Sequence, residues 1–148
     1  MLVVGSGIRF RIQVLKPGFV LLTGSGSRAV SLDDADAELA MLRELDSELQ
    51  RCGELTVFAD LRDTSLLEAH SREVAVDWMR DNRGKLKTSH VLVRSKLIEM
   101  AMSVAAILVG AGVLKLHSQP RAFLHLVRDA APNLVELPVI HRHSLTGS

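Results

Sequence analysis

The sequence predicts one α/β domain, in which an N-terminal β-hairpin is followed by alternating helices and strands that form a mostly parallel, mixed sheet. The chain has 148 residues, the size of one domain, and its sequence shows neither an internal repeat nor a domain-separating linker. Its composition, 47% hydrophobic and 24% charged, is that of an ordinary globular protein. Segments of helical period alternate with strand-like segments, an order that favours right-handed crossovers onto a parallel sheet. We expect a core over residues 8–131 and a C-terminal tail over residues 132–148.

The chain opens with the predicted hairpin. Apolar and polar residues alternate over Ile8–Leu15, as in a half-buried strand. Lys16–Gly18 then supplies Pro for the first central position of a tight turn and Gly for a second position with positive φ. Phe19–Thr23 is therefore expected to return antiparallel to the first strand, and Gly24–Ser27 to be a flexible loop.

A helix and an interior strand come next. Ser31 or Asp33 can cap the helix, and Gly53 ends it. Its apolar positions recur at helical spacing and are expected to face the core: Leu39, Leu42, Leu45, Leu49 and Cys52. Leu55–Leu61 is apolar and rich in residues that favour strands, which predicts a strand inside the sheet.

Three more helices and two more strands complete the prediction. The helices are Leu66–Asn82, Leu97–Val109 and one that starts at Ser118 or Pro120 and stops at Pro132, and the strands are His90–Arg94 and Val113–Leu116. The Leu97–Val109 helix is expected to face inward with Leu97, Met100, Ala101, Val104, Ala105 and Leu108, and the last helix with Ala122, Phe123, Leu126, Val127 and Ala130. In the tail, Val135–Ile140 could be an added edge strand or a partner-binding segment.

The order of these elements, together with Val57–Leu61, resembles the STAS domain of bacterial anti-sigma-factor antagonists and the related SpoIIAA-like proteins. In that family a central strand ends in Asp-Leu, as Asp60 and Leu61 do here, before a functional loop whose serine is phosphorylated to switch partner binding. Read without gaps, the loop motif falls on Glu68–Ser71, where Ala69 stands at the phosphoacceptor position. A gap of one or two residues would give that role to Ser71 or Ser65. A phosphate there is compatible with the exposed N–H groups of a helix N-terminus.

The resemblance implies a non-enzymatic regulatory module that binds a protein partner, such as an anti-sigma factor or a kinase-like regulator, and needs no cofactor. The implied partner-binding residues run from the end of the central strand into the next helix: Asp60, Arg62, Asp63, Thr64, Ser65, Glu68, His70, Ser71 and Arg72. The alternative is a SpoIIAA-like domain that binds a small ligand or a lipid in a pocket bounded by Asp60, Thr64 and Ser95.

Other chemical motifs in the sequence have weaker support. Gly24–Ala29 has the letters of a pyrophosphate loop, but it follows a hairpin strand and no acidic residue closes the next strand at the required distance. His141 and His143, with Glu136, are too few ligands to predict a metal site. Cys52 is expected to fill the core rather than act as a nucleophile, because it ends an acidic helix.

Two carboxylates at the end of the central strand could bind a cation or order the strand end. Asp60 and Asp63, with Glu68, could bind a cation at the carboxyl end of a parallel strand. No phosphate-binding loop accompanies them, so we favour strand-end capping and loop ordering by Arg62 or Arg72. The remaining histidines, His70, His90, His117 and His125, are scattered along the sequence, and we expect His117 and His125 at the edges of elements.

Composition excludes several classes of function. Aromatic residues make up 3% of the chain and the net charge is +1, which argues against nucleic-acid binding. The apolar run Met100–Leu114 is shorter than the roughly 20 residues of a membrane span. Cys52 is the only cysteine and Met1–Gly7 lacks the basic start of a secretory signal, so we expect a cytoplasmic protein.

Charge is distributed unevenly along the chain. Asp33–Glu54 contains eight acidic residues against two basic ones, whereas Arg80–Lys96 contains six basic residues against one acidic residue. Opposed patches of this kind select a partner or let two copies dock head to tail. Both segments could equally be ordinary solvated faces.

Overall fold

A computed structural model describes residues 2–4, 8–26, 32–64, 69–94, 96–110 and 112–132. In chain order its elements are β1 (Leu2–Val4), β2 (Ile8–Lys16), β3 (Phe19–Gly26), α1 (Leu32–Cys52), β4 (Leu55–Thr64), α2 (Ala69–Asp81), β5 (Leu86–Leu92), α3 (Lys96–Val109), β6 (Leu114–His117) and α4 (Pro120–Ala130). The predicted α/β class, with a hairpin before alternating helices and strands, is confirmed. The tail that follows Pro132 lies outside the described residues.

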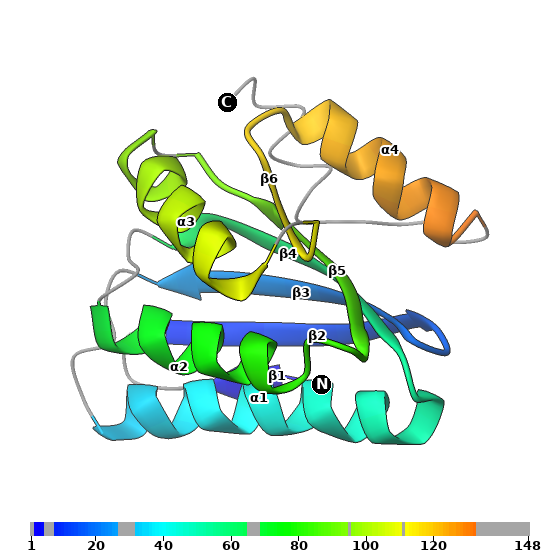
Figure 1. The fold of residues 1–148 in the computed structure, drawn as a ribbon, viewed down its shortest axis with the longest axis horizontal. Coiled ribbons are helices and arrows are strands. Elements are labelled where there is room, and N and C mark those ends of the chain that lie inside the picture. Colours follow the sequence, from blue (N-terminus) through cyan, green and yellow to red (C-terminus); the bar gives the residue numbers. More distant parts are fainter. Residues whose placement is uncertain are drawn as a thin grey trace.

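The strands form one sheet in the order β1-β2-β3-β4-β5-β6 (Figure 1). β1, β2 and β3 pair antiparallel, and β3 to β6 pair parallel, so the sheet is mixed and mostly parallel as predicted. β1 was not predicted, because three apolar residues between Met1 and a Gly-Ser-Gly stretch show too short an alternation to indicate a strand.

The tight turn between β2 and β3 is built around Gly18. Its φ is +82°, a left-handed conformation that glycine adopts without strain. The Gly18 N–H donates a hydrogen bond to Glu48 Oε2 of α1 (3.0 Å), and the Gly18 carbonyl accepts one from the Thr56 N–H (2.8 Å). The turn therefore joins the hairpin both to α1 and to the first parallel strand.

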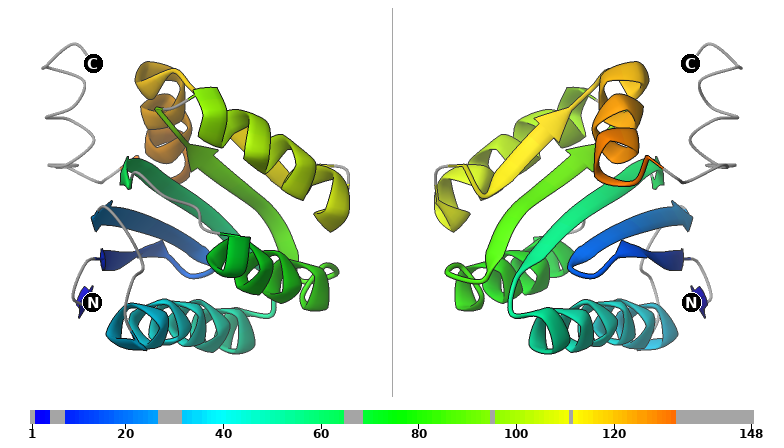
Figure 2. Two further views of the ribbon diagram at one scale, coloured as in Figure 1. Left: turned by 90° about the vertical axis from the view of Figure 1, so that its left-hand side faces the viewer. Right: turned by 90° about the vertical axis from the view of Figure 1, so that its right-hand side faces the viewer.

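Helices cover the two faces of the sheet unequally (Figures 1 and 2). The larger core packs α1, α2 and α3 on one face, through residues such as Leu45, Leu49, Met79 and Val109. On the other face α4 is the one helix among the described residues, and it packs Phe123, Val127 and Ala130 against Leu21, Phe58 and Leu92. These three inward positions of α4 were predicted correctly, whereas Ala122 is exposed and Leu126 only half-buried.

Several strand boundaries differ from the sequence prediction. Gly24, Ser25 and Gly26, expected in a flexible loop, continue β3, because Ser25 and Gly26 pair with Asp63 and Thr64 of a longer β4. β5 begins at Leu86 and ends at Leu92, whereas His90–Arg94 was predicted. The backbone pairing offered by β4 decides these ends, and local composition does not reveal it.

The inward face of α3 was predicted correctly at Ala105 and wrongly at three other positions, while the side chains of Leu97 and Ala101 are outside the described ones. Met100, Val104 and Leu108 were expected in the core but are 61%, 60% and 55% exposed. The buried positions are Met102, Ala105 and Val109. α3 is apolar around much of its circumference, so its sequence cannot fix which side faces the sheet. Leu39 of α1, 43% exposed, is a smaller error of the same kind.

Candidate functional site

The carboxyl end of β4 contains a buried ion pair. Asp60 and Arg62 are 2% and 5% exposed and lie two residues apart, hence on the same face of the strand. Arg62 Nε donates to Asp60 Oδ1 (3.0 Å) and an Arg62 terminal nitrogen to Oδ2 (2.9 Å). The Arg62 backbone N–H adds a third bond to Oδ1 (3.2 Å). The structure thus shows the Asp60 carboxylate held by Arg62, the arrangement favoured from sequence over cation binding.

A second, exposed ion pair joins this strand end to β5. Arg94 lies 3.8 Å from Asp63 Oδ1, and the two side chains are 53% and 32% exposed. Solvent screens such a pair, so it contributes little to stability. Its position shows instead that the ends of β4 and β5, and the starts of the helices that follow them, lie at one edge of the sheet.

The other predicted partner-binding residues follow this edge. Thr64 is the last residue of β4, and His70, Ser71 and Arg72 lie in the first turns of α2, although their side chains are not among those described. Ser65 and Glu68 lie outside the described residues, as does Ser95 of the alternative ligand pocket. Ser71 is the third residue of α2, near the N–H groups that a helix leaves unpaired at its start.

Beside α2, α3 exposes a stripe of large apolar side chains. Met100, Val104, Ile107 and Leu108 are 61%, 60%, 80% and 55% exposed, and their spacing places them on one side of the helix. We call these four residues the α3 stripe. Scattered exposed apolar residues are ordinary, whereas these four form a contiguous row on one helix. Sequence analysis missed the stripe because it placed three of these residues in the core.

Two histidines that are far apart in sequence meet on the α4 side of the sheet. His90 Nδ1 of β5 lies 2.9 Å from His117 Nε2 of β6. The His90 ring stacks on Phe58 at 5.1 Å between centroids, and the His117 ring meets the edge of Phe123 at 6.0 Å. Burial first, and then the positive charges of His117 and Lys115, lower the pKa of His90 to about 4. Burial and Lys115 also lower the pKa of His117, so the two rings are neutral near pH 7.

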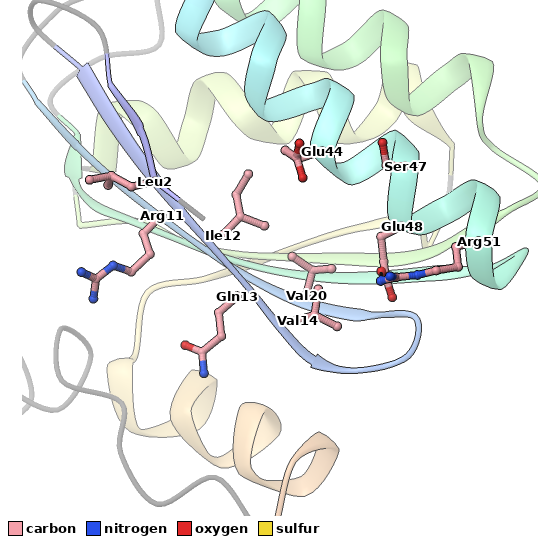
Figure 3. A pocket seen from close by; sticks show the side chains of 10 residues that line it. All are labelled: Leu2, Arg11, Ile12, Gln13, Val14, Val20, Glu44, Ser47, Glu48 and Arg51. Atoms are coloured by element: carbon pink, nitrogen blue, oxygen red, sulfur yellow. Dashed lines mark ion pairs between the residues drawn. The ribbon is translucent and has the colours of Figure 1, made fainter.

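A groove of about 760 Å³ lies between α1 and the outer part of β2 (Figure 3). We call it the β2 groove; its lining residues are Leu2, Arg11, Ile12, Gln13, Val14, Val20, Glu44, Ser47, Glu48 and Arg51. Glu48, which is 4% exposed, binds the Gly18 N–H with one oxygen and pairs with Arg51 through the other. None of the residues in this groove was singled out as a site from sequence.

The remaining features considered from sequence are metal sites, membrane-spanning helices and three further histidines. Within the described residues no three His, Cys, Asp or Glu side chains gather as a metal site would require, and none of the described helices is long and apolar enough to cross a membrane. His125 is 79% exposed and lies 3.8 Å from Asp129, a surface position. His141 and His143, in the tail, are outside the described part of the chain.

Comparison with known proteins identifies the fold. No family model and no curated protein sequence matches the chain. Among solved structures, an uncharacterized DUF3478-family protein with a SpoIIAA-like fold from Shewanella loihica PV-4 is 18% identical, with a TM-score of 0.57 over 82% of this chain and 94% of that one. The Bacillus cell fate determinant SpoIIAA in its phosphorylated form is 12% identical, with a TM-score of 0.56 over 79% of this chain and 98% of that one. The chain therefore has the SpoIIAA-like fold that its sequence resembles.

Proposed function

We propose that this chain is a non-enzymatic regulatory module, similar to anti-sigma-factor antagonists, that binds a protein partner with the α3 stripe and the segment from Asp63 to Arg72. The observation that carries this proposal is the α3 stripe, which exposes four large apolar side chains on one helix. Exposed apolar surface is unfavourable in water, and its burial by a partner lowers the free energy. The SpoIIAA-like fold supports it, since the phosphorylated SpoIIAA structure is a cell fate determinant of this fold.

The edge of the sheet gives the proposed surface its shape. α2 and α3 begin just after the ends of β4 and β5, where Asp63 and Arg94 lie 3.8 Å apart. Asp60 and Arg62 are buried against each other, so their part in partner binding is to fix the end of β4 beneath the surface. The contacts themselves fall to the Asp63–Arg72 segment and to the α3 stripe.

A phosphate on Ser71 or Ser65 would regulate this surface. Ser71 lies in the first turn of α2, where unpaired backbone N–H groups and the helix dipole accommodate negative charge. The added charge would stand next to the segment that binds the partner, so phosphorylation is expected to change affinity rather than the fold.

The test combines partner identification with matched variants. Affinity capture and cross-linking identify a candidate protein, and calorimetry with the purified protein then compares the chain with its Ile107→Asp and Ser71→Asp variants. We expect Ile107→Asp to weaken binding at least tenfold while the melting temperature stays within about 2 °C, because Ile107 is 80% exposed. Leu39→Asp is the matched control, since Leu39 is an exposed apolar residue of α1, away from the α3 stripe.

Two results would refute the proposal. One is a partner whose affinity is equal for the Ile107→Asp and Leu39→Asp variants. The other is native mass spectrometry that recovers a stoichiometric lipid or small molecule and no protein, which would favour the ligand-binding alternative.

A further inference from the structure

The α1 side of the β2 groove carries two carboxylates. Glu44 and Glu48 both line the groove and lie four residues apart on α1, hence on one side of the helix. Four residues advance an α-helix by about 6 Å, which sets the spacing of these two positions along the groove. Figure 3 shows the Arg11 side chain extending from β2 on the side away from α1. Among the described lining residues, Arg51 is therefore the one basic side chain on the α1 side, against two carboxylates.

Glu48 is a buried carboxylate whose counter-charge is exposed. Its side chain is 4% exposed, and its Oε2 accepts hydrogen bonds from the Gly18 N–H (3.0 Å) and the Cys52 thiol (3.2 Å). The other oxygen, Oε1, makes no hydrogen bond among the described residues and forms an ion pair with Arg51, whose side chain is 69% exposed. A long, solvated side chain holds such a pair weakly, so a cation that enters the groove can replace Arg51 beside Oε1.

The strand side of the groove is apolar. Ile12 and Val20 are buried, whereas Leu2 and Val14, which also line the groove, are 57% and 47% exposed. Methylene groups of a ligand that cover these side chains would remove apolar surface from water, which is favourable. The volume of about 760 Å³ is one at which proteins bind small molecules. An acidic wall beside an apolar wall suits a ligand with positive charge at its ends and an aliphatic middle.

We propose that the β2 groove binds an aliphatic polyamine, the smallest of which is a diamine with two ammonium groups joined by methylene groups. One ammonium group pairs with Glu48 in place of Arg51, and a second pairs with Glu44. The methylene groups between them lie against Ile12 and Val14. A chain of four methylene groups separates two ammonium groups by about the 6 Å that four helical residues span.

The charge of the groove also sets which ligands it disfavours. An anionic ligand in the same place would put its charge beside Glu44 and Glu48, and Coulomb repulsion opposes that arrangement. A neutral aliphatic ligand would separate Arg51 from the buried Glu48 carboxylate, or leave the pair intact, without supplying a new counter-charge. The polyamine site is independent of partner binding through the α3 stripe.

An NMR titration of the full chain with 1,4-diaminobutane tests the ligand class and its place. The methyl signals of Ile12, Val14 and Val20 should shift. The matched control is n-butylamine, which keeps the four carbons and has one ammonium group. We expect it to bind about fivefold more weakly, because one ion pair is lost. Adipate, which carries negative charges on the same methylene chain, should not bind. Absence of diamine binding, equal affinities for the diamine and the monoamine, or binding of adipate instead would overturn the proposal.

Variants of α1 separate the groove from the overall charge of the chain. Glu44→Gln should weaken diamine binding about fivefold, to the affinity of the monoamine. The matched control is Asp46→Asn, the same change of charge on the same helix at a residue that is not among those lining the groove. It should leave the affinity unchanged. Arg51→Ala should strengthen binding, because it removes the cation that competes for Glu48. Equal weakening by Glu44→Gln and Asp46→Asn, or weaker binding after Arg51→Ala, would also overturn the proposal.

Discussion

Acidification should destabilise the fold through the His90–His117 pair. The folded protein keeps His90 neutral, with a pKa of about 4 against an ordinary 6.5, while the unfolded chain protonates it near 6.5. Between these values the unfolded state binds more protons, so the free energy of unfolding falls as the pH drops from 6.5 to about 4. Above pH 6.5 both states are neutral at this residue, and its contribution is constant.

The magnitude follows from the pKa difference and from exposure. Each pKa unit corresponds to about 1.36 kcal/mol, which sets a ceiling of about 3.4 kcal/mol for His90. His90 is only half-buried, so water screens part of the repulsion from His117 and Lys115, and we expect a loss of about 1–2 kcal/mol. The two imidazoles share a 2.9 Å hydrogen bond, in which one ring donates and the other accepts. Protonation of the accepting ring removes its accepting nitrogen and breaks this bond.

Urea unfolding at several pH values between 7.5 and 4.5 measures this loss. Carboxylates also titrate in this range, so the diagnostic quantity is the difference between the chain and its His90→Gln variant. The variant should lose about 1–2 kcal/mol less on acidification than the parent chain. Equal pH dependence for the His90→Gln variant and the parent, or an NMR titration of His90 near pH 6.5, would refute the reasoning.

Two further predictions concern stability. Arg62→Met leaves the Asp60 carboxylate buried without a counter-charge and should lower the free energy of unfolding in urea by about 3 kcal/mol or more. A second change, Asp60→Asn, should recover part of this loss. A loss below about 1 kcal/mol would contradict the role given to this pair. Gly18→Ala should cost about 1–2 kcal/mol, because φ is +82° and a Cβ would lie 3.1 Å from the Glu54 carbonyl oxygen. The control is Gly84→Ala, whose Cβ meets no atom within 4 Å, and equal stability of the two glycine variants would contradict this account.

Local sequence signals were sufficient for the order and type of most elements. Three elements were predicted from residues adjacent in sequence, and all three are confirmed. They are the alternating strand Ile8–Leu15, the Pro-Gly turn and the apolar strand Leu55–Leu61. β1 was missed because three residues do not establish a period. β3 was predicted too short, because its last residues owe their extended conformation to pairing with β4 rather than to their own preference.

The features of the candidate sites depend on contacts that are remote in sequence. His90 and His117 are 27 residues apart, and only the parallel pairing of β5 with β6 brings their rings together. The α3 stripe depends on the rotation of a helix that is apolar on nearly all sides, which its own sequence leaves undetermined. The ion pair of Asp60 with Arg62 is the exception. Its members are two residues apart on one strand, and the sequence analysis had named Arg62, with Arg72 as the alternative, as the residue that orders this strand end.

The α3 stripe and the β2 groove lie on different parts of the fold. The α3 stripe lies on a helix that packs against α2 and β6, whereas β2 lies beyond β3 at the other side of the sheet. The parallel strands β3, β4 and β5 stand between them, and buried apolar residues of the larger core fill the space beneath the helices. A close-packed core of this kind does not transmit a local change from one surface to the other unless the core itself has a second arrangement. A change at the β2 groove should therefore leave partner affinity at the α3 stripe unchanged.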